Sequence, residues 1–164
     1  MKKAPFEQKQ FDVNEVVQET VRFLSSLAVG RNFKLVSAIT PEALPILGDR
    51  IQLQQVILNL VVNGIDAMRD TSSENRVISI RTARVETFAD LSVSDRGPGI
   101  PEDRLKEVFE PFYTSKANGM GMGLSIARTI VEAHNGQIWA KNRDHGGASL
   151  RIKLPLCTDG AGAV

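Results

Sequence analysis

The sequence contains almost no cysteine and no surplus of charge of either sign. Cys157 is the single cysteine among 164 residues, which excludes a disulfide framework and a zinc site built from cysteines. The 20 basic residues balance the 19 acidic ones, so the overall charge gives no sign of a dedicated nucleic-acid-binding protein. We therefore expect a protein of a reducing compartment, the cytoplasm, without a nucleic acid partner.

Long hydrophobic runs, a signal peptide and internal repeats are also missing. No apolar stretch approaches the roughly 20 residues that a membrane-spanning helix needs. The basic start at Lys2 and Lys3 leads into the polar residues 7–10 instead of the apolar core of a signal peptide. A chain of this length is expected to form one soluble domain with a core of its own.

The spacing of apolar residues predicts helices that alternate with strands. Helices are predicted at residues 14–28, 49–69, 102–108 and 123–135. Strands are predicted at residues 33–39, 77–85, 87–95, 137–141 and 148–154, with a reversal near Glu86 and a loop around Pro41 and Pro45. Because the strands are grouped in hairpins, we expect an α+β, two-layer sandwich. Its mixed, mostly antiparallel five-stranded sheet would be covered on one face by three helices.

Asp95 ends one of the predicted strands and is followed by Arg96-Gly97-Pro98-Gly99-Ile100. An aspartate at this place can fix one polar edge of a ligand, and the glycines let the backbone approach that ligand closely. The same hexapeptide is also typical of an ordinary turn between a strand and a helix. It indicates a ligand site only in combination with three other segments.

Two asparagines and an aspartate share one face of the helix predicted at 49–69. Asn59, Asn63 and Asp66 stand at i, i+4 and i+7. Amides within so apolar a helix are costly unless they have partners, so they either bond to neighbouring backbone or line a polar site. Two of them on one face, together with the Asp95 turn, favour the polar site. An amide oxygen is a ligand that Mg²⁺ accepts when phosphates and waters fill its other positions.

A glycine cluster, Gly119-Met120-Gly121-Met122-Gly123-Leu124, opens the last predicted helix. Free N–H groups at a helix start attract an anion, although a flexible loop is the alternative. The cluster has neither the lysine of a P-loop nor the preceding strand of a dinucleotide fingerprint. Upstream, Phe109 is interpreted as a core anchor. Lys116 is either a phosphate contact or a solvated loop lysine.

Together and in this order, the four segments resemble the N, G1, F and G2 boxes of the ATP-binding catalytic domain of sensor histidine kinases. The matching segments are Asn59–Asn63, Asp95–Gly99, Phe109–Phe112 and Gly119–Leu124. The resemblance runs from about Asp12 to Pro155. It implies the Bergerat fold of the GHKL superfamily, which type II topoisomerases, mismatch-repair ATPases and heat-shock chaperones share. The few residues between Phe112 and Gly121 resemble the short-lid kinases.

The resemblance implies that the domain binds ATP and Mg²⁺. Asp95 would accept a hydrogen bond from the adenine amino group, and Asn63 would bind Mg²⁺ through its side-chain oxygen. The residues that it assigns to ATP are Asn59, Asn63, Asp66, Asp95, Gly97, Gly99, Ile100, Phe112, Lys116, Gly119, Gly121, Gly123 and Leu124. The residues that it assigns to catalysis are Asn59, which would support the phosphate side, and Lys116, which could contact the terminal phosphate.

Asn59 separates a kinase from the hydrolysing members of the superfamily, which carry a glutamate there as general base. An amide cannot take a proton from water. The resemblance therefore implies transfer of the γ-phosphate to a histidine on a separate dimerisation domain, with a response regulator downstream. His134 and His145 are interpreted as structural or solvated, because neither is followed by an acidic residue. A GHKL ATPase or serine kinase of the anti-sigma type, and a non-enzymatic docking module, are the alternatives.

The chain is accordingly interpreted as an excised catalytic domain. Residues 1–11 would be the remnant of a linker, 12–156 the domain and 157–164 a flexible tail. The parent protein is expected to be a homodimer and the isolated domain a monomer. Its signal, its cognate regulator and its attachment to a membrane are left open.

Overall fold

The structure is a computed structural model that describes residues 8–30, 32–111 and 123–157. Its helices are α1 (Val13–Ala28), α2 (Arg50–Ala67) and α3 (Gly123–Ala133), and its short 3-10 turns are η1 (Ser73–Asn75), η2 (Glu102–Arg104) and η3 (Glu107–Phe109). Its strands are β1 (Lys9–Asp12), β2 (Lys34–Ala38), β3 (Pro45–Gly48), β4 (Val77–Val85), β5 (Phe88–Ser94), β6 (Gln137–Asn142) and β7 (Ala148–Pro155).

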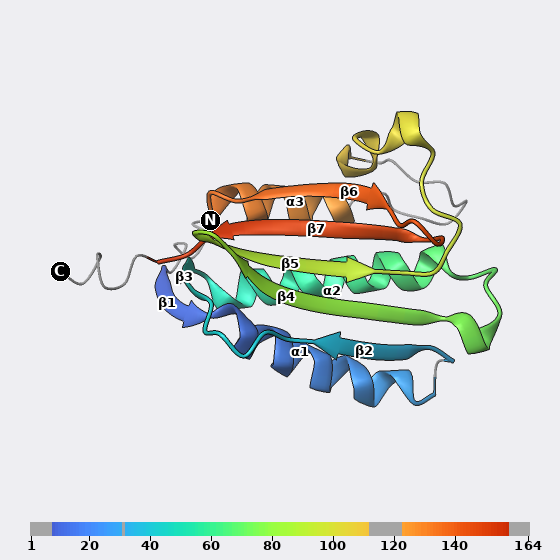
Figure 1. The fold of residues 1–164 in the computed structure, drawn as a ribbon, viewed down its shortest axis with the longest axis horizontal. Helices are drawn as coiled ribbons and strands as arrows, with labels where there is room; N and C mark the ends of the chain where they lie inside the picture. The colour runs from blue at the N-terminus through green and yellow to red at the C-terminus, as the bar shows by residue number, and fades with distance from the viewer. Residues whose placement is uncertain (1–7, 31, 112–122, 158–164) are drawn as a thin grey trace, which may run out of the picture.

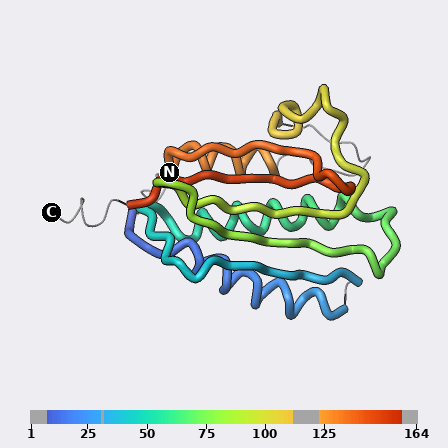
Figure 2. Tube along the Cα trace, in the orientation of Figure 1, coloured from blue at the N-terminus to red at the C-terminus, as the bar shows by residue number. Residues whose placement is uncertain are grey.

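The main body consists of a five-stranded sheet and three helices that cover one of its faces (Figure 1). The strand order is β2-β4-β5-β7-β6, in which β2 runs parallel to β4 and the other neighbours are antiparallel. The hairpins β4–β5 and β6–β7 lie side by side along the trace (Figure 2). This arrangement confirms the predicted α+β sandwich with its mixed, mostly antiparallel sheet.

The core lies between the helices and the sheet. In α2, apolar side chains at helical spacing are buried, and in each central strand every second side chain is buried on the helical side. Fully or almost fully buried side chains include Leu53, Ile57, Leu60, Ile78, Ile80, Leu91 and Ile152. Burial of each such side chain contributes roughly 1.5–3 kcal/mol. Within the ranges given above, no helix is long and apolar enough to cross a membrane.

The predicted helix boundaries coincide with side-chain and backbone caps. Asp12 accepts a hydrogen bond from the N–H of Asn14 at 2.9 Å and so caps α1. Asp49 accepts from the N–H groups of Ile51 and Gln52 at the start of α2, as its position in the sequence predicted. After α3, Asn135 has a φ of 63°, the left-handed conformation expected of a helix stop.

The N-terminal region differs from its prediction. Residues 1–11 were expected to be a linker and Pro45 to lie in a loop, but Lys9–Asp12 and Pro45–Gly48 pair as the antiparallel strands β1 and β3. Four residues are too few for a clear alternation of apolar and polar side chains, so the pattern gave no signal. Pro45 is the first residue of its strand, where proline is tolerated. The folded part of the chain therefore begins before residue 12.

The segment after Pro101 also differs. A short helix was expected over 102–108, but the structure has two separate 3-10 turns, η2 and η3. A single helix of seven residues is marginal in water, and connectors of this length commonly adopt 3-10 turns instead. Phe109 at the end of η3 is 4% exposed, which agrees with its interpretation as a core anchor.

Candidate functional site

Asp95 follows the last residue of β5 and is only 4% exposed. Its Oδ1 accepts hydrogen bonds from the N–H of Gly97 at 2.8 Å and from the N–H of Ala148 at 3.2 Å. Its Oδ2 has no hydrogen-bond partner among the described residues. The carboxylate is thus held in place through one oxygen, while the other can accept from a ligand.

Burial raises the pKa of the Asp95 carboxyl, because desolvation disfavours its charged form. The hydrogen bonds from Gly97 and Ala148 and the positive charge of Arg143 act in the opposite direction but are weaker. A donor from a ligand would stabilise the carboxylate further. Asp95 is therefore a buried acceptor that gains from a partner.

The backbone after Asp95 turns sharply at Gly99, which has a φ of +85°. A side chain at this position would be strained and would place its Cβ 2.8 Å from Oδ1 of Asn142. The turn brings residues 95–100 against the C-terminal half of α2. There Gly64 lies so close that a Cβ on it would come within 3.5 Å of Cβ of Asp95. The predicted loop and the predicted helix face therefore meet.

The end of β6 and the start of the turn after it support this loop, a role that the sequence did not reveal. Asn142 binds both backbone groups of Ile100: its Oδ1 accepts from the N–H at 2.8 Å, and its Nδ2 donates to the carbonyl at 2.7 Å. Arg143 donates through Nη1 to the backbone carbonyl of Asp95 at 2.8 Å. The sequence indicated only a turn here, because nothing in the spacing links residues more than 40 positions apart.

The polar face of α2 is half-buried beside the loop, as predicted. Nδ2 of Asn59 donates to the carbonyl of Gly123 at 3.0 Å, and its Oδ1 accepts from Nε2 of Gln55 at 2.8 Å. Asn59 therefore connects α2 to the first residue of α3. The side chain of Asn63, one turn further on, forms no hydrogen bond with any described residue. Of the two amides, Asn63 is the one available to a ligand.

The residues that could hold a metal ion here are few. In the part of the chain that the structure describes, no group of three or more His, Cys, Asp or Glu residues is arranged to bind one. The amide oxygen of Asn63 fits Mg²⁺ if phosphate oxygens and waters supply the remaining ligands, which is the usual way in which nucleotide-bound Mg²⁺ is held.

The remaining predicted residues divide between α3 and the segment before it. Gly123 is the exposed first residue of α3, whereas the side chain of Leu124 is buried in the core. Phe112, Lys116, Gly119 and Gly121 lie outside the described residues. Gly123 follows residues 112–122 in the sequence, and its carbonyl accepts a hydrogen bond from Asn59. The asparagine face of α2, which is predicted to lie beside the phosphates, therefore borders on the start of α3.

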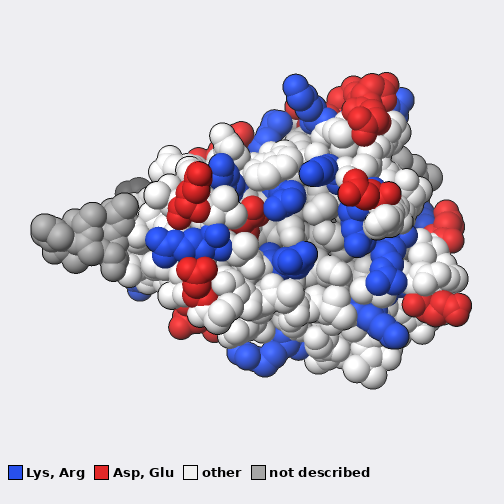
Figure 3. All heavy atoms as spheres, viewed as in Figure 1, with Lys and Arg blue, Asp and Glu red and all other residues white. Residues whose placement is uncertain are grey.

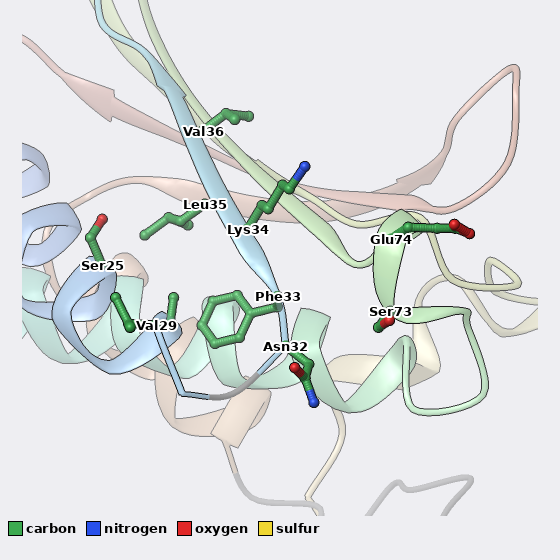
Figure 4. Close-up of a pocket in the computed structure, with 10 residues that line it drawn as sticks. Ser25, Val29, Asn32, Phe33, Lys34, Leu35, Val36, Ser73 and Glu74 are labelled. Carbon is green, nitrogen blue, oxygen red and sulfur yellow. The ribbon is translucent and has the colours of Figure 1, made fainter.

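A hollow of about 560 Å³ between the end of α1 and β2 lies apart from these residues (Figure 4). Phe33 and Leu35 line it together with Val29 and Asn32, and none of the predicted site residues does. It is wide open to solvent. The candidate functional site is therefore the one at Asp95 and α2.

The chain also matches a known protein family, curated proteins and solved structures. The model of the family described as histidine kinase-, DNA gyrase B- and HSP90-like ATPases matches residues 48–158. The sensor histidine kinase TmoS of Ectopseudomonas mendocina is 38% identical over 151 residues, which cover 90% of this chain and 15% of that protein. The first curated relatives are much longer, and the chain spans 15–30% of their lengths.

Solved structures show the same fold. The catalytic domain of histidine kinase ThkA in its nucleotide-free form has a TM-score of 0.80 and 34% identity, with 92% of this chain and 96% of that chain covered. The structure of ThkA in complex with the response regulator TrrA has a TM-score of 0.78 and 32% identity, with 92% and 42% covered.

Proposed function

Because the chain belongs to the family of histidine kinase-, DNA gyrase B- and HSP90-like ATPases, as the catalytic domain of a two-component sensor histidine kinase, we propose how its own residues bind Mg-ATP and serve phosphoryl transfer. The observation that carries the proposal is the free Oδ2 of the buried Asp95, at a loop held against the amide face of α2.

Asp95 would recognise adenine. Oδ1 is already occupied by two backbone N–H groups, so Oδ2 is the acceptor for an exocyclic amino group. Asn142 occupies both the N–H and the carbonyl of Ile100. Ile100 would therefore contact the base through its side chain. Gly97 and Gly99 let this loop pack closely, because a Cβ would lie 2.6 Å from the carbonyl oxygen of Ala67 at Gly97 and 2.8 Å from Oδ1 of Asn142 at Gly99. The loop held in this way would present the buried carboxylate of Asp95 to the base.

Asn63 and the start of α3 would hold the phosphates. Asn63 would supply an amide oxygen to Mg²⁺, which neutralises phosphate charge and orients the terminal phosphate when it is bound. Asp66 lies further along the same half-buried face. The N–H groups of Gly123 and Leu124 stand at a helix N-terminus, where an anion is favoured. Lys116, Phe112, Gly119 and Gly121 are proposed as further contacts on sequence grounds.

Asn59 favours transfer of the phosphate over its hydrolysis. An amide that is bonded to Gly123 and Gln55 cannot act as a base toward water. In the proposed reaction a histidine nitrogen of the dimerisation domain forms a bond to the γ-phosphorus. The bond from that phosphorus to the bridging oxygen breaks, and ADP leaves. Through its hydrogen bond to Gly123, Asn59 would hold the start of α3 against α2 during the transfer.

The partners are proposed by analogy with the relatives. ThkA forms a complex with a response regulator, so a response regulator is the expected recipient of the phosphate downstream. The acceptor histidine would belong to a dimerisation domain of the parent protein. The parent protein would be a homodimer, and this part of it would lie in the cytoplasm. Residues 12–156 would be the catalytic unit, although β1 extends it to Lys9.

Calorimetric titration of the purified chain with ADP and Mg²⁺ tests the adenine assignment. Asp95→Asn should weaken binding by about tenfold or more. The acceptor Oδ2 is replaced by an amide NH2 group, which cannot accept a hydrogen bond from the amino group of adenine. Asp90→Asn is the matched control, since Asp90 is on the same strand but pairs with Arg151 on the other face of the sheet. Unchanged affinity in Asp95→Asn would refute the assignment.

The transfer step is tested with [γ-³²P]ATP and a separately purified histidine-bearing dimerisation domain. Acid-labile phosphate on that domain, with little free phosphate in its absence, is the expected result. Rapid release of inorganic phosphate without any acceptor would favour an ATPase, and acid-stable phosphate on serine would favour a serine kinase.

A further inference from the structure

The face of the sheet that the helices leave open is rich in basic side chains. Figure 3 looks onto this face: lysine and arginine gather over its middle, and most aspartate and glutamate side chains lie toward its margin. The whole chain has a net charge of only +1, so this is a local concentration and no consequence of composition. Such a field attracts an anionic partner.

The strand register arranges these side chains in two cross-strand rows. In the first row, Ser79, Ser94, Ser149 and Lys141 are neighbours on successive strands. In the second, the neighbours are Arg81, Ser92, Arg151 and Trp139. Paired residues point to the same face of a sheet. Short serines between long cations leave a hollow of about 560 Å³, to which we refer as the cationic hollow.

The cationic hollow has more positive groups than its own acids can neutralise. Arg81, Lys141, Arg143 and Arg151 line it, against Asp90 and Asp144. Arg151 pairs with Asp90 at 3.2 Å. Arg81 and Lys141 are exposed and form no ion pair with any residue in the described ranges. The hollow therefore has at least two cations free to bind an acid.

Hydrogen-bonding groups also line the hollow between the cations. Nε of Arg151 is enclosed and has no partner among the described residues. The hydroxyls of Ser94 and Ser149 bond to each other at 2.9 Å, while Ser79 and Ser92 lie beside them on the same surface. Guanidinium and hydroxyl groups together are suited to carboxylate oxygens.

The two aromatic side chains on this face argue against a nucleic acid. Cζ of Arg151 lies 6.0 Å from the ring centroid of Trp139, and Nζ of Lys153 lies 4.4 Å from that of Phe88. Rings that are covered by cations are not open to stack with bases, which single-stranded nucleic acid binding relies on. The cations are also spread over several strands, about 10 Å apart between β4 and β7. This spacing suits separate carboxylates along an extended chain better than one small anion.

We propose that the cationic hollow on the open face of the sheet binds an extended acidic segment of a partner protein, with carboxylates at Arg81 and Lys141 and polar groups at the serines. This inference goes beyond nucleotide binding and does not depend on it, since Asn142 and Arg143 are the only residues lining the hollow whose side chains hydrogen-bond to residues 95–100 among the described residues.

The single tryptophan of the chain reports on this surface directly. We would titrate the nucleotide-free chain with a short peptide of alternating glutamate and serine and record the fluorescence of Trp139. A matched glutamine–serine peptide, inorganic phosphate and a single-stranded oligonucleotide are the comparison ligands. A saturable change with the glutamate peptide alone, which weakens as salt is added, is expected.

Variants locate the binding site. Arg81→Gln and Lys141→Gln each remove one exposed cation and should weaken binding of the peptide by about threefold to fivefold. Arg22→Gln removes the same charge from the exposed surface of α1 and should leave binding unchanged. Equal losses in all three variants, absence of saturation, or tighter binding of phosphate or the oligonucleotide would overturn the proposal.

Discussion

Asn142 holds Ile100 by both of its backbone groups, with an N–H···Oδ1 distance of 2.8 Å and an Nδ2···carbonyl distance of 2.7 Å. One amide thus replaces the strand partner that Ile100 lacks. Through it, the end of β6 fixes the far end of the loop that begins at Asp95.

Replacement of Asn142 by alanine should loosen this loop. Two hydrogen bonds to partly buried groups are lost, which should lower the free energy of unfolding by about 1–3 kcal/mol and also weaken ADP binding. Asn75→Ala, whose side chain bonds only to the exposed Ser72, should cost less than about 1 kcal/mol. Chemical denaturation and calorimetry check both values. A variant as stable as the wild type would show that the loop is held by other contacts.

The pKa of Asp95 predicts how stability depends on pH. Burial raises the folded pKa above 3.8, so the folded state retains this proton longer than the unfolded state. Stability should then fall as pH rises from the unfolded pKa through the folded pKa. Asp95→Asn removes this titration and should be more stable than the wild type at neutral pH but no longer so in acid. Denaturation midpoints across a pH series test the sign, and a wild type more stable at neutral pH contradicts it.

Two adjacent glycines provide a matched pair. Gly147 has a φ of +90°, and a Cβ there would overlap the carbonyl oxygen of Asp95. Gly146 has a φ of +104° but no atom within 4 Å of such a Cβ. We expect Gly147→Ala to cost roughly 2–4 kcal/mol and to impair nucleotide binding. Gly146→Ala should cost only about 1–2 kcal/mol and leave binding intact. Similar effects of the two would mean that the approach to Asp95 is unimportant.

Replacement of the two histidines should have different effects on stability. His134 is 5% exposed, accepts from the N–H of Asp49 through Nε2 at 3.0 Å, and contacts the carbonyl of Ile130 through Nδ1 at 2.8 Å. His134→Ala should lower stability by about 2–4 kcal/mol. His145→Ala, at an exposed turn, should change it by no more than about 0.5 kcal/mol. Neither should reduce phosphate transfer to the supplied acceptor domain beyond its effect on folding; loss of labelling in His145→Ala would refute this.

Asn59 and Asn63 are predicted to act differently despite their common face. Asn63→Ala should weaken Mg²⁺-dependent nucleotide binding by about tenfold and leave binding in EDTA unchanged. Asn59→Ala breaks the bond to Gly123 and should lower stability by about 1 kcal/mol. Titrations with and without Mg²⁺ distinguish them. If both variants lost the same Mg²⁺-dependent part, Asn63 would not be the specific ligand.

Local signals were enough to predict most of the fold. Asp49 caps α2 and Asn135 ends α3 because such choices depend on neighbouring backbone alone. Glu86, with a φ of 57°, makes the predicted reversal between β4 and β5. The pairing of β1 with β3 was not predicted, because the two strands lie more than 30 residues apart in the sequence. No pattern of neighbouring residues shows which distant segment will pair with Pro45–Gly48.

The sequence predicted the parts of the candidate site that lie within one short segment. It did not predict the parts that come together only when distant segments pack. Asp95, Gly97 and Gly99 lie within five consecutive residues, and Asn59 and Asn63 share one face of a helix, so local patterns were enough to single them out. Asn142 and Arg143 reach the same loop from a distant hairpin, and their contribution appears only when β5 and β7 are paired. The predicted roles of all these residues in nucleotide binding stay predictions, and Lys116 and Gly121 also lie outside the described residues.

Both ends of the described chain meet at β3: Lys9 pairs with Gly48, and the N–H of Cys157 donates to the carbonyl of Pro45 at 2.8 Å. Asp95 lies at the other end of β5, roughly 23 Å away for a strand of this length. Any flanking chain therefore attaches at a single pivot, and the proposed nucleotide site lies at the far end of the domain from it. A rotation of a few degrees at that pivot would swing this far end by an ångström or more, without any change inside the domain.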